Sequence, residues 1–310
     1  MKLFNINQYK IDTSKFSGLH DEVVQEFEHE VASFVGAKYA CGVNSATNAI
    51  FLSLLDKKQT VKIPSMIPPV VCNAILTSGN QLSFEDNVDW VGDSYILHKF
   101  GDYKIIDSAQ KLEKDQYINE ANPEDLMIFS FYPTKPVGSF DGGMIVSNDK
   151  TKIDQFRIMT MNGSTFDKKS WKRKFEKVGY KCYLNAIQAY IGLQNLSILE
   201  EKYEKLDAIR EHYNAYFGLN NTSNHLYRIS VDNRKQLLEA SKEHGIELGI
   251  HYEAAHLNPL YKCDSMDLPN TITSHNKTVS IPFNEKMSLN QASKVISFIH
   301  KNAALSKTHK

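Results

Sequence analysis

Short apolar runs alternate with stretches of helical spacing through the first half of the 310-residue chain. Helices are expected over 21–35, 49–55 and about 69–77, where apolar residues recur with a helical period. Strands that alternate with helices predict an α/β domain with a mainly parallel sheet and helices on its faces. Ligands of such sheets bind at the carboxyl ends of the strands, so the turns after these runs are the first places to look for a site. The runs that predict strands cover 39–43, 61–64, 95–97, 103–106, 126–131 and 143–146.

The second half of the chain predicts a smaller unit. Residues 184–217 contain few helix breakers apart from Gly192, which indicates one long helix or two abutting helices. We expect a large domain over 1–196 and a small C-terminal α+β domain over 197–310. The elements predicted in the small domain are strands at 226–231 and near 246–250, and helices at 233–244 and 289–301.

Composition and simple motifs exclude several classes of protein. Lysine plus arginine and aspartate plus glutamate balance at 36 each, so no net charge favours nucleic acid or an anionic membrane surface. Residues 1–18 lack the continuous apolar core of a signal peptide, and no window approaches the roughly twenty apolar residues that span a bilayer. The 11 histidines form no HExxH motif. The four cysteines, Cys41, Cys72, Cys182 and Cys263, form no CxxC pair. We therefore expect a cytoplasmic protein with reduced cysteines and no bound metal.

Three polar motifs follow predicted strands of the first half. Asn44–Thr47 follows the first strand, Asp107–Gln110 follows the run at 103–106, and Ser130–Lys135 follows the run at 126–131. The carboxyl ends of parallel strands meet at one edge of a sheet. We therefore expect the three motifs to face one crevice.

The residue types in these motifs match the chemical needs of pyridoxal 5′-phosphate (PLP). PLP needs a lysine amine for a covalent bond and an acid beside its ring nitrogen, and Lys135 and Asp107 fit these needs. Its phosphate needs donors, for which the N–H groups of residues 46–47 at a helix start and the Ser130 hydroxyl are suitable. Taken alone, each residue has a plainer interpretation, such as a helix N-cap for Ser45. Together they indicate one cofactor.

The same motifs resemble those of a known family, the DegT/DnrJ/EryC1/StrS aminotransferases, from about Val24 to Phe298. Asn44–Ala49 is similar to the family's NSGTxAL turn, Asp107–Gln110 to its DxAQ, and Ser130–Gly143 to its SFxxTKxxxxxxGG. Further stretches that resemble the family are Gly179–Leu193, His251–Tyr261 and Ser280–Pro282.

This resemblance implies a PLP-dependent transferase of fold type I. In that case Lys135 carries the cofactor and Asp107 binds its ring nitrogen. Lys181 lies in the stretch that reaches the phosphate in the neighbouring subunit of a homodimer, and it is equally interpretable as a surface lysine. The other residues that the resemblance assigns to the cofactor are Ser45, Ala46, Thr47 and Ser130 at the phosphate and Gln110 at the ring hydroxyl.

The resemblance also implies an activity. Members of the family transfer an amino group, here expected from L-glutamate, to a nucleotide-linked keto-deoxysugar. The products are amino sugars for surface polysaccharides or other glycoconjugates. His251, Tyr252 and His256 lie in a stretch expected near the sugar substrate.

The chain also departs from the family pattern. Pro68 stands near the position of an aromatic residue that stacks on PLP, and Lys181 and Tyr183 replace the usual Asn and Arg. The stretch 84–107 is compressed, which is expected to remove a strand–helix excursion. Within it, His98 belongs to a segment similar to the family's VHxxG, but we favour its interpretation as a structural loop histidine.

These departures leave other functions open. One alternative is a regulatory or structural homologue, with or without PLP, that has lost turnover. A nucleotide-sugar-binding protein without PLP does not explain Lys135, Asp107 and Ser130 together. One branch of the family dehydrates sugars and has histidine at the lysine position, and Lys135 argues against membership in that branch.

Overall fold

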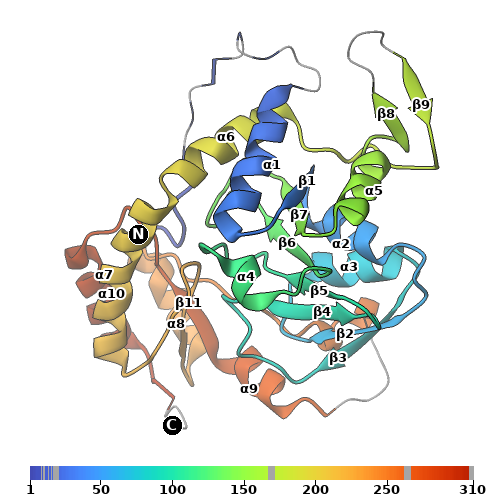
Figure 1. Ribbon diagram of the computed structural model, residues 1–310. Coiled ribbons are helices and arrows are strands. Elements are labelled where there is room, and N and C mark those ends of the chain that lie inside the picture. The colour runs from blue at the N-terminus through green and yellow to red at the C-terminus, as the bar shows by residue number, and fades with distance from the viewer. Residues whose placement is uncertain are drawn as a thin grey trace.

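The computed structural model describes residues 1–7, 9, 11–12, 14, 16, 21–166, 172–261 and 267–306. Its centre is a five-stranded sheet (Figure 1). The strand order is β1 (Tyr39–Val43), β7 (Gly143–Ser147), β6 (Leu126–Ser130), β5 (Lys104–Asp107) and β4 (Tyr95–Lys99). A further pair, β2 (Thr60–Pro64) and β3 (Gln81–Glu85), lies beside β4. Every apolar run of the first half therefore forms a strand as expected, and β3 is an addition to that prediction.

The strands of this sheet run in mixed directions. β5 is parallel to β6 and β2 is parallel to β3, whereas the β1–β7, β6–β7 and β4–β5 pairs are antiparallel. β4 continues into β5 through a turn in which Phe100 N–H donates to Tyr103 O, and so short a connection permits only an antiparallel pair. The expected α/β class is confirmed, with more antiparallel pairing than a mainly parallel sheet has. In the compressed stretch 84–107 this hairpin connects β4 directly to β5.

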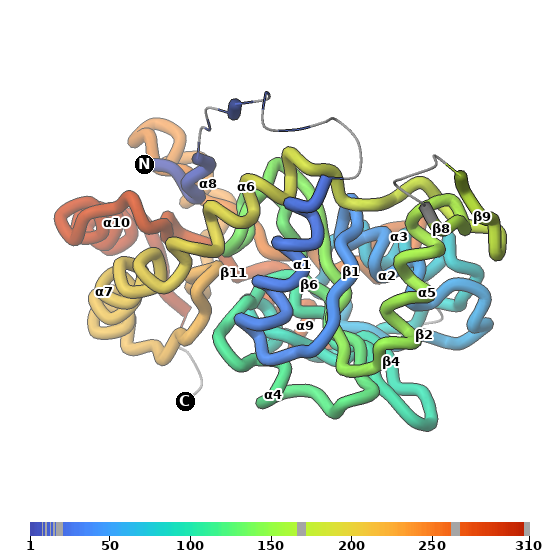
Figure 2. The backbone as a smooth tube through the Cα atoms, turned by 45° about the horizontal axis from the view of Figure 1, so that its top comes forward, coloured from blue at the N-terminus to red at the C-terminus, as the bar shows by residue number. Residues whose placement is uncertain are grey.

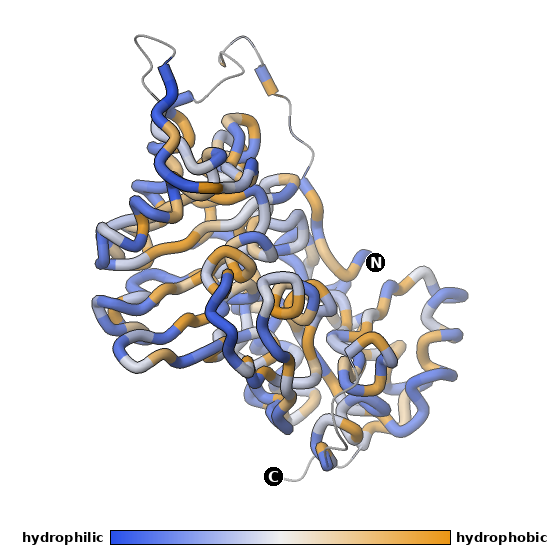
Figure 3. Tube along the Cα trace, turned by 90° about the vertical axis from the view of Figure 1, so that its right-hand side faces the viewer, coloured by the Kyte–Doolittle hydropathy of each residue, from blue (hydrophilic) through white to orange (hydrophobic). Residues whose placement is uncertain are grey.

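Helices cover both faces of the sheet. Leu126 and Ile128 of β6 belong to one hydrophobic core with α2, α3 and α5, while Met127 and Phe129 belong to a second core with α1 and α6. Successive residues of a strand point to opposite faces, so a strand buried on both faces reads as a continuous apolar run. Figure 3 shows hydrophobic stretches of the chain running through the interior of the molecule. The helices of this part are α1 (Glu22–Val35), α2 (Ala46–Leu54), α3 (Pro69–Thr77), α4 (Gln116–Glu120), α5 (Lys150–Thr160) and α6 (Ala186–Ser197).

The C-terminal part has a core of its own, to which α7, α8, α10, β10 and β11 contribute. Residues 184–217 form two abutting helices, α6 and α7, which is one of the two expected arrangements. The boundary between the domains near residue 196 stays a prediction. The elements of this part are α7 (Leu199–Phe217), β10 (Tyr227–Ser230), α8 (Arg234–Glu243), η2 (Ala255–Leu257), η3 (Pro259–Tyr261), α9 (Pro269–Lys277), β11 (Thr278–Ile281) and α10 (Leu289–Asn302).

The strand expected near 246–250 was wrong. Only Gly249 pairs with a strand, through two backbone hydrogen bonds with Ser280 of 3.0 and 2.8 Å. The chain then turns, and the next contact with Ser280 comes from the His251 ring, whose Nδ1 lies 2.9 Å from Ser280 Oγ. The apolar residues near 246–250 led to the prediction of a strand, but the chain leaves the edge of the sheet after the single pair Gly249–Ser280.

The first residues of the chain lie against its C-terminal part. Glu247 N–H donates to Met1 O at 2.9 Å, and Phe283 N–H donates to Leu3 O at 3.3 Å. Figure 2 shows the N-terminus beside α8, far from α1 in that view. The chain then reaches α1, and much later a hairpin of β8 (Ser164–Phe166) and β9 (Arg173–Phe175) projects from the molecule (Figure 1).

The cysteines and the helices can be compared with the expectations of reduced thiols and of no membrane-spanning segment. Cys41, Cys72 and Cys182 are buried, no disulfide joins any two of these three described cysteines, and burial raises the pKa of the Cys41 thiol to about 12. Cys263 lies outside the described residues. None of the helices within the described part of the chain is long and apolar enough to cross a membrane.

A substitution at Gly192 of α6 would test how closely α6 packs on α1. A Cβ at this position would lie 2.7 Å from Phe27 Cε1 and 2.8 Å from Cε2. Alanine gains about 1 kcal/mol over glycine inside a helix, but overpacking costs about 1–3 kcal/mol. We expect Gly192→Ala to lower the free energy of unfolding by about 1 kcal/mol in urea denaturation. Gly101→Ala, whose Cβ would meet nothing within 4 Å, is the control. A Gly192→Ala protein more stable than the wild type would contradict this packing.

Candidate active site

Gly143 joins two of the predicted motifs. It is the register partner of Val43 on one side, just before Asn44–Thr47, and of Ser130 on the other. A Cβ on Gly143 would lie 2.5 Å from Ala46 N and 2.7 Å from Ser45 C. Only a residue without a side chain lets the first turn of α2 approach the sheet this closely. The motifs after β1 and β6 therefore meet at one edge, as expected.

The N-terminus of α2 is arranged as an anion site. Ser45 Oγ accepts from Asn48 N–H at 3.2 Å, so its hydroxyl is the helix N-cap. The first intrahelical bond is made by Ala49 N–H, 3.1 Å from Ser45 O, so the N–H groups of Ala46 and Thr47 precede it. Free N–H groups and the helix dipole favour a phosphate at this position.

Lys135 and Asp107 are electrostatically coupled at this edge of the sheet. Burial lowers the pKa of the Lys135 amine from 10.5 to about 8, and the Asp107 charge partly opposes this shift. Burial raises the pKa of the Asp107 carboxyl, opposed by hydrogen bonds from Ala109 and Tyr95 and by the Lys135 charge. Asp107 ends β5 and Lys135 follows β6, so the parallel pairing of these strands brings them to one edge. Lys135 is consequently much easier to deprotonate than an ordinary lysine.

The segment before β5 supports the Asp107–Gln110 motif. Asp107 Oδ1 accepts from Ala109 N–H at 2.9 Å, and Oδ2 accepts from the Tyr95 hydroxyl at 2.8 Å. Gln110 is buried, and its Oε1 accepts from Gly92 N–H at 2.9 Å. The sequence did not indicate Tyr95 or Gly92, because their contacts depend on the register of β4 against β5 and on the packing of the segment before β4.

The C-terminal part supplies the opposite wall. Burial, together with the charges of Lys135 and Arg228, lowers the pKa of His251 to about 4, so its ring is neutral near Lys135. Burial also raises the pKa of Tyr252, with the Asp107 charge as the second cause. The Phe4 ring stacks on His225 at 5.4 Å between centroids and meets His251 edge-on at 5.7 Å.

Sequence reasoning missed two of these wall residues. Phe4 and His225 come from segments that hold no motif, so no signal in either stretch identified them. The structure brings His251 and Tyr252 toward Lys135 and Asp107, in line with the stretch expected near the substrate.

Other predicted residues lie farther along the crevice or at the surface. His256 Nδ1 lies 2.6 Å from Ser65 Oγ at the end of β2, and its ring is 6.3 Å from that of Phe84. Lys181 is exposed, and its backbone pairs with Met161 in an isolated bridge. Pro68 is the residue before α3. His98 lies on the β4–β5 hairpin, with its ring 4.7 Å from that of Phe100.

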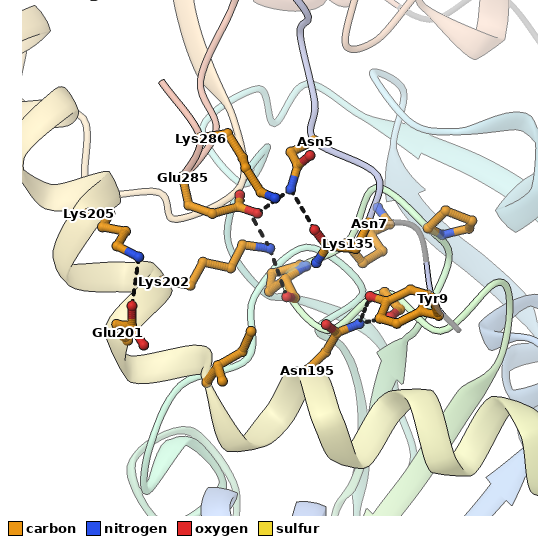
Figure 4. A pocket seen from close by; sticks show the side chains of 14 residues that line it. Asn5, Asn7, Tyr9, Lys135, Asn195, Glu201, Lys202, Lys205, Glu285 and Lys286 are labelled. Carbon is orange, nitrogen blue, oxygen red and sulfur yellow. Dashed lines mark hydrogen bonds and ion pairs between the residues drawn. The ribbon is translucent and has the colours of Figure 1, made fainter. Parts of the chain in front are cut away.

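A cavity of about 190 Å³ lies beside the Lys135 loop (Figure 4). Lys202 of α7 donates to Pro136 O at 3.0 Å and lies 3.9 Å from Glu285 Oε2. Asn5 Nδ2 donates to Glu285 Oε1 at 2.6 Å. These contacts attach the loop that carries Lys135 to α7 and to the first residues of the chain.

Comparison with known proteins agrees with this geometry. The model of the DegT/DnrJ/EryC1/StrS aminotransferase family matches residues 10–88 and 105–300 and leaves out 89–104, where β4 lies. The UDP-4-amino-4,6-dideoxy-N-acetyl-beta-L-altrosamine transaminase of Campylobacter jejuni is 27% identical and aligns over 93% of each chain. The spore coat polysaccharide biosynthesis protein SpsC of Bacillus subtilis is also 27% identical, over 88% of this chain and 87% of its own.

Solved structures share the fold. The Helicobacter pylori aminotransferase PseC, involved in pseudaminic acid biosynthesis, superposes with a TM-score of 0.78 at 18% identity, over 97% of this chain and 99% of its own. The aminotransferase TlmJ of Streptoalloteichus hindustanus gives a TM-score of 0.80 at 19% identity, over 96% and 98%. The expected fold of type I is thereby confirmed.

The lowered pKa of Lys135 is directly testable. Pulse acylation between about pH 6 and pH 11, read by mass spectrometry, is expected to give a midpoint for Lys135 near pH 8, with exposed Lys62 as the reference. Since the Asp107 charge raises this pKa, Asp107→Asn is expected to move the midpoint lower still. A midpoint no lower than that of an ordinary lysine, or an upward shift in Asp107→Asn, would show that the amine is not desolvated beside this carboxylate.

Proposed function

The chain belongs to the DegT/DnrJ/EryC1/StrS aminotransferase family, and on that premise we propose that it moves an amino group from L-glutamate to the keto carbon of a nucleotide-linked sugar. It does so with PLP as cofactor. The observation that carries the proposal is the electrostatic coupling of Lys135 to the buried Asp107 at the sheet edge where α2 begins. An amine, a carboxylate and a helix N-terminus are the three groups that PLP needs, and they occur here in one crevice.

The residues fit the cofactor at each of its polar ends. Gly143 leaves room for a phosphate-binding turn against the sheet, where Ser130 and the N–H groups of residues 46–47 would hold the phosphate. Asp107 would accept from the protonated ring nitrogen, and Gln110 would contact the ring hydroxyl. When bound, PLP supplies an electron sink that stabilises negative charge on the substrate carbon next to the amine.

Lys135 Nζ has two tasks in this proposal. With a pKa of about 8, roughly a tenth of the amine is neutral at pH 7, far more than of an ordinary lysine, so it can act as a nucleophile toward the cofactor. Once released, the same Nζ can take a proton from the substrate carbon and return it at the neighbouring position, because its pKa lies near the working pH. The Asp107 carboxylate keeps the opposite end of the site negative throughout.

The substrate side is formed by the C-terminal part. We propose that His251 and Tyr252 contact the sugar near Lys135, and that His256, held by Ser65, contacts it farther out. A neutral His251 ring can donate or accept a hydrogen bond without adding positive charge beside the Lys135 amine. The names of the relatives from C. jejuni and B. subtilis support amino-sugar and polysaccharide biosynthesis as the setting. We propose that the enzyme works in the cytoplasm.

The Lys135→Arg variant tests this function. Arginine does not lose its proton near neutral pH, so it can neither bond to PLP nor shuttle a proton. We expect amino transfer to fall by at least about 10³-fold. The measurement is the loss of the visible absorbance of bound PLP on addition of L-glutamate and its return with each member of a panel of nucleotide-linked keto sugars.

Lys62→Arg, at an exposed lysine of β2, is the matched control and should keep the wild-type rate. Wild-type turnover by the Lys135→Arg protein would refute the assignment of Lys135. A wild-type protein that takes up no PLP would instead favour a regulatory or structural homologue.

We also propose a homodimer in which Lys181 reaches the phosphate of the neighbouring site. Lys181 is exposed, and an ammonium can bind phosphate as a point charge. Sedimentation is expected to give twice the chain mass of 35.3 kDa. Lys181→Ala should remain dimeric but bind PLP about tenfold more weakly, while Lys62→Ala should not change the affinity. Equal affinity in Lys181→Ala and wild type would remove Lys181 from the phosphate site.

A further inference from the structure

Residues 89–104 lie outside the family match, yet they contact two residues of the crevice. The Tyr95 hydroxyl donates to Asp107 Oδ2 at 2.8 Å, and Gly92 N–H donates to Gln110 Oε1 at 2.9 Å. Both acceptors belong to the motif proposed to bind the cofactor ring. The segment that departs from the family is therefore also the segment that supports this motif.

The direction of β4 is what brings Tyr95 to the site. Tyr95 begins β4 and is the register partner of Asp107, which ends β5. A parallel strand would instead place its last residue, Lys99, beside Asp107. The two ends of a five-residue strand lie roughly 13 Å apart, far beyond hydrogen-bonding distance. The hairpin at 100–103 thus creates the contact.

We propose that Tyr95 is a positioning residue for Asp107. Its hydroxyl, held at the start of β4, donates to Oδ2 and keeps the carboxylate charged and turned toward the ring nitrogen of the cofactor. The inference rests on the proposed function for the identity of the cofactor, but the contact between the two side chains does not.

Packing fixes the Tyr95 ring independently of its hydroxyl. Tyr95 is 7% exposed, and its ring lies 4.6 Å from that of Trp90. Trp90 in turn stacks on Tyr252 at 6.3 Å with an interplanar angle of 11°. A phenylalanine at position 95 would keep these ring contacts and lose only the donor to Asp107.

The charges around Asp107 give the sign of the effect. The groups that act on it are the Tyr95 hydroxyl and the Lys135 ammonium, which both favour the carboxylate, and the backbone N–H of Ala109. Tyr252 also faces it, and its pKa is raised, so it stays a neutral phenol. Loss of the Tyr95 donor removes one of the groups that stabilise the charged form, so the pKa of Asp107 rises. At a given acidic pH, less carboxylate is then available for the cofactor.

The experiment compares Tyr95→Phe with Tyr103→Phe, a tyrosine of the same hairpin whose ring stacks on Phe100 away from Asp107. The Kd for PLP is measured from about pH 5 to pH 9. In Tyr95→Phe the pH below which PLP affinity falls is expected to rise by about one unit. Binding should then be roughly tenfold weaker than in wild type at acidic pH and near wild type at high pH. Ionisation of free PLP is common to all three proteins and cancels in the comparison.

A second readout does not depend on PLP. The carboxyl carbon of Asp107, assigned by its loss in Asp107→Asn, is titrated by NMR in the cofactor-free proteins. Its midpoint should be higher in Tyr95→Phe than in wild type and unchanged in Tyr103→Phe. An unchanged midpoint, or a loss of PLP affinity that is the same at every pH, would overturn the role of Tyr95. If the wild type bound no PLP, the proposed function would fail, and the carbon titration would still decide whether Tyr95 controls the charge of Asp107.

Discussion

The close approach of the first turn of α2 to β7 determines the geometry of the site. Gly143 makes it possible, because a side chain there would overlap the backbone at Ser45 and Ala46. The same glycine pairs with Val43 and with Ser130, so it fixes the distance between the start of α2 and the Ser130 hydroxyl on the neighbouring strand. The parallel pairing of β5 and β6 then adds Asp107 and Lys135 at that edge.

Burial and charge work together within this frame. Desolvation alone would drive Lys135 and Asp107 toward their neutral forms. The charge of each group partly opposes the pKa shift that desolvation causes in the other. The result is an amine that can lose its proton near neutral pH beside an acid supported by two hydrogen-bond donors. The neutral His251 ring limits further positive charge on the opposite wall.

The sequence indicated the parts of the site that lie in short local patterns. Lys135, Asp107 and the turn before Thr47 each follow an apolar run, and such runs could be recognised as strands whose ends carry function. The contact of Tyr95 was not predicted, because it depends on the register of β4 against β5, which shifts between Ile96 and His98. Phe4 and His225 were missed for another reason. They become neighbours only through tertiary packing, and nothing in their local sequence records it.

The position of Phe4 has a consequence for the order in which this protein can mature. Phe4 rests on His225 and His251, and the backbone of Leu3 is held by Phe283. During synthesis residues 1–4 leave the ribosome long before residues 225–283 exist. The β-sheet and Lys135 can assemble in the meantime, but the contacts of Phe4 with His225 and His251 form only later. This side of the site is therefore completed late, by residues that are more than 200 positions apart in the sequence.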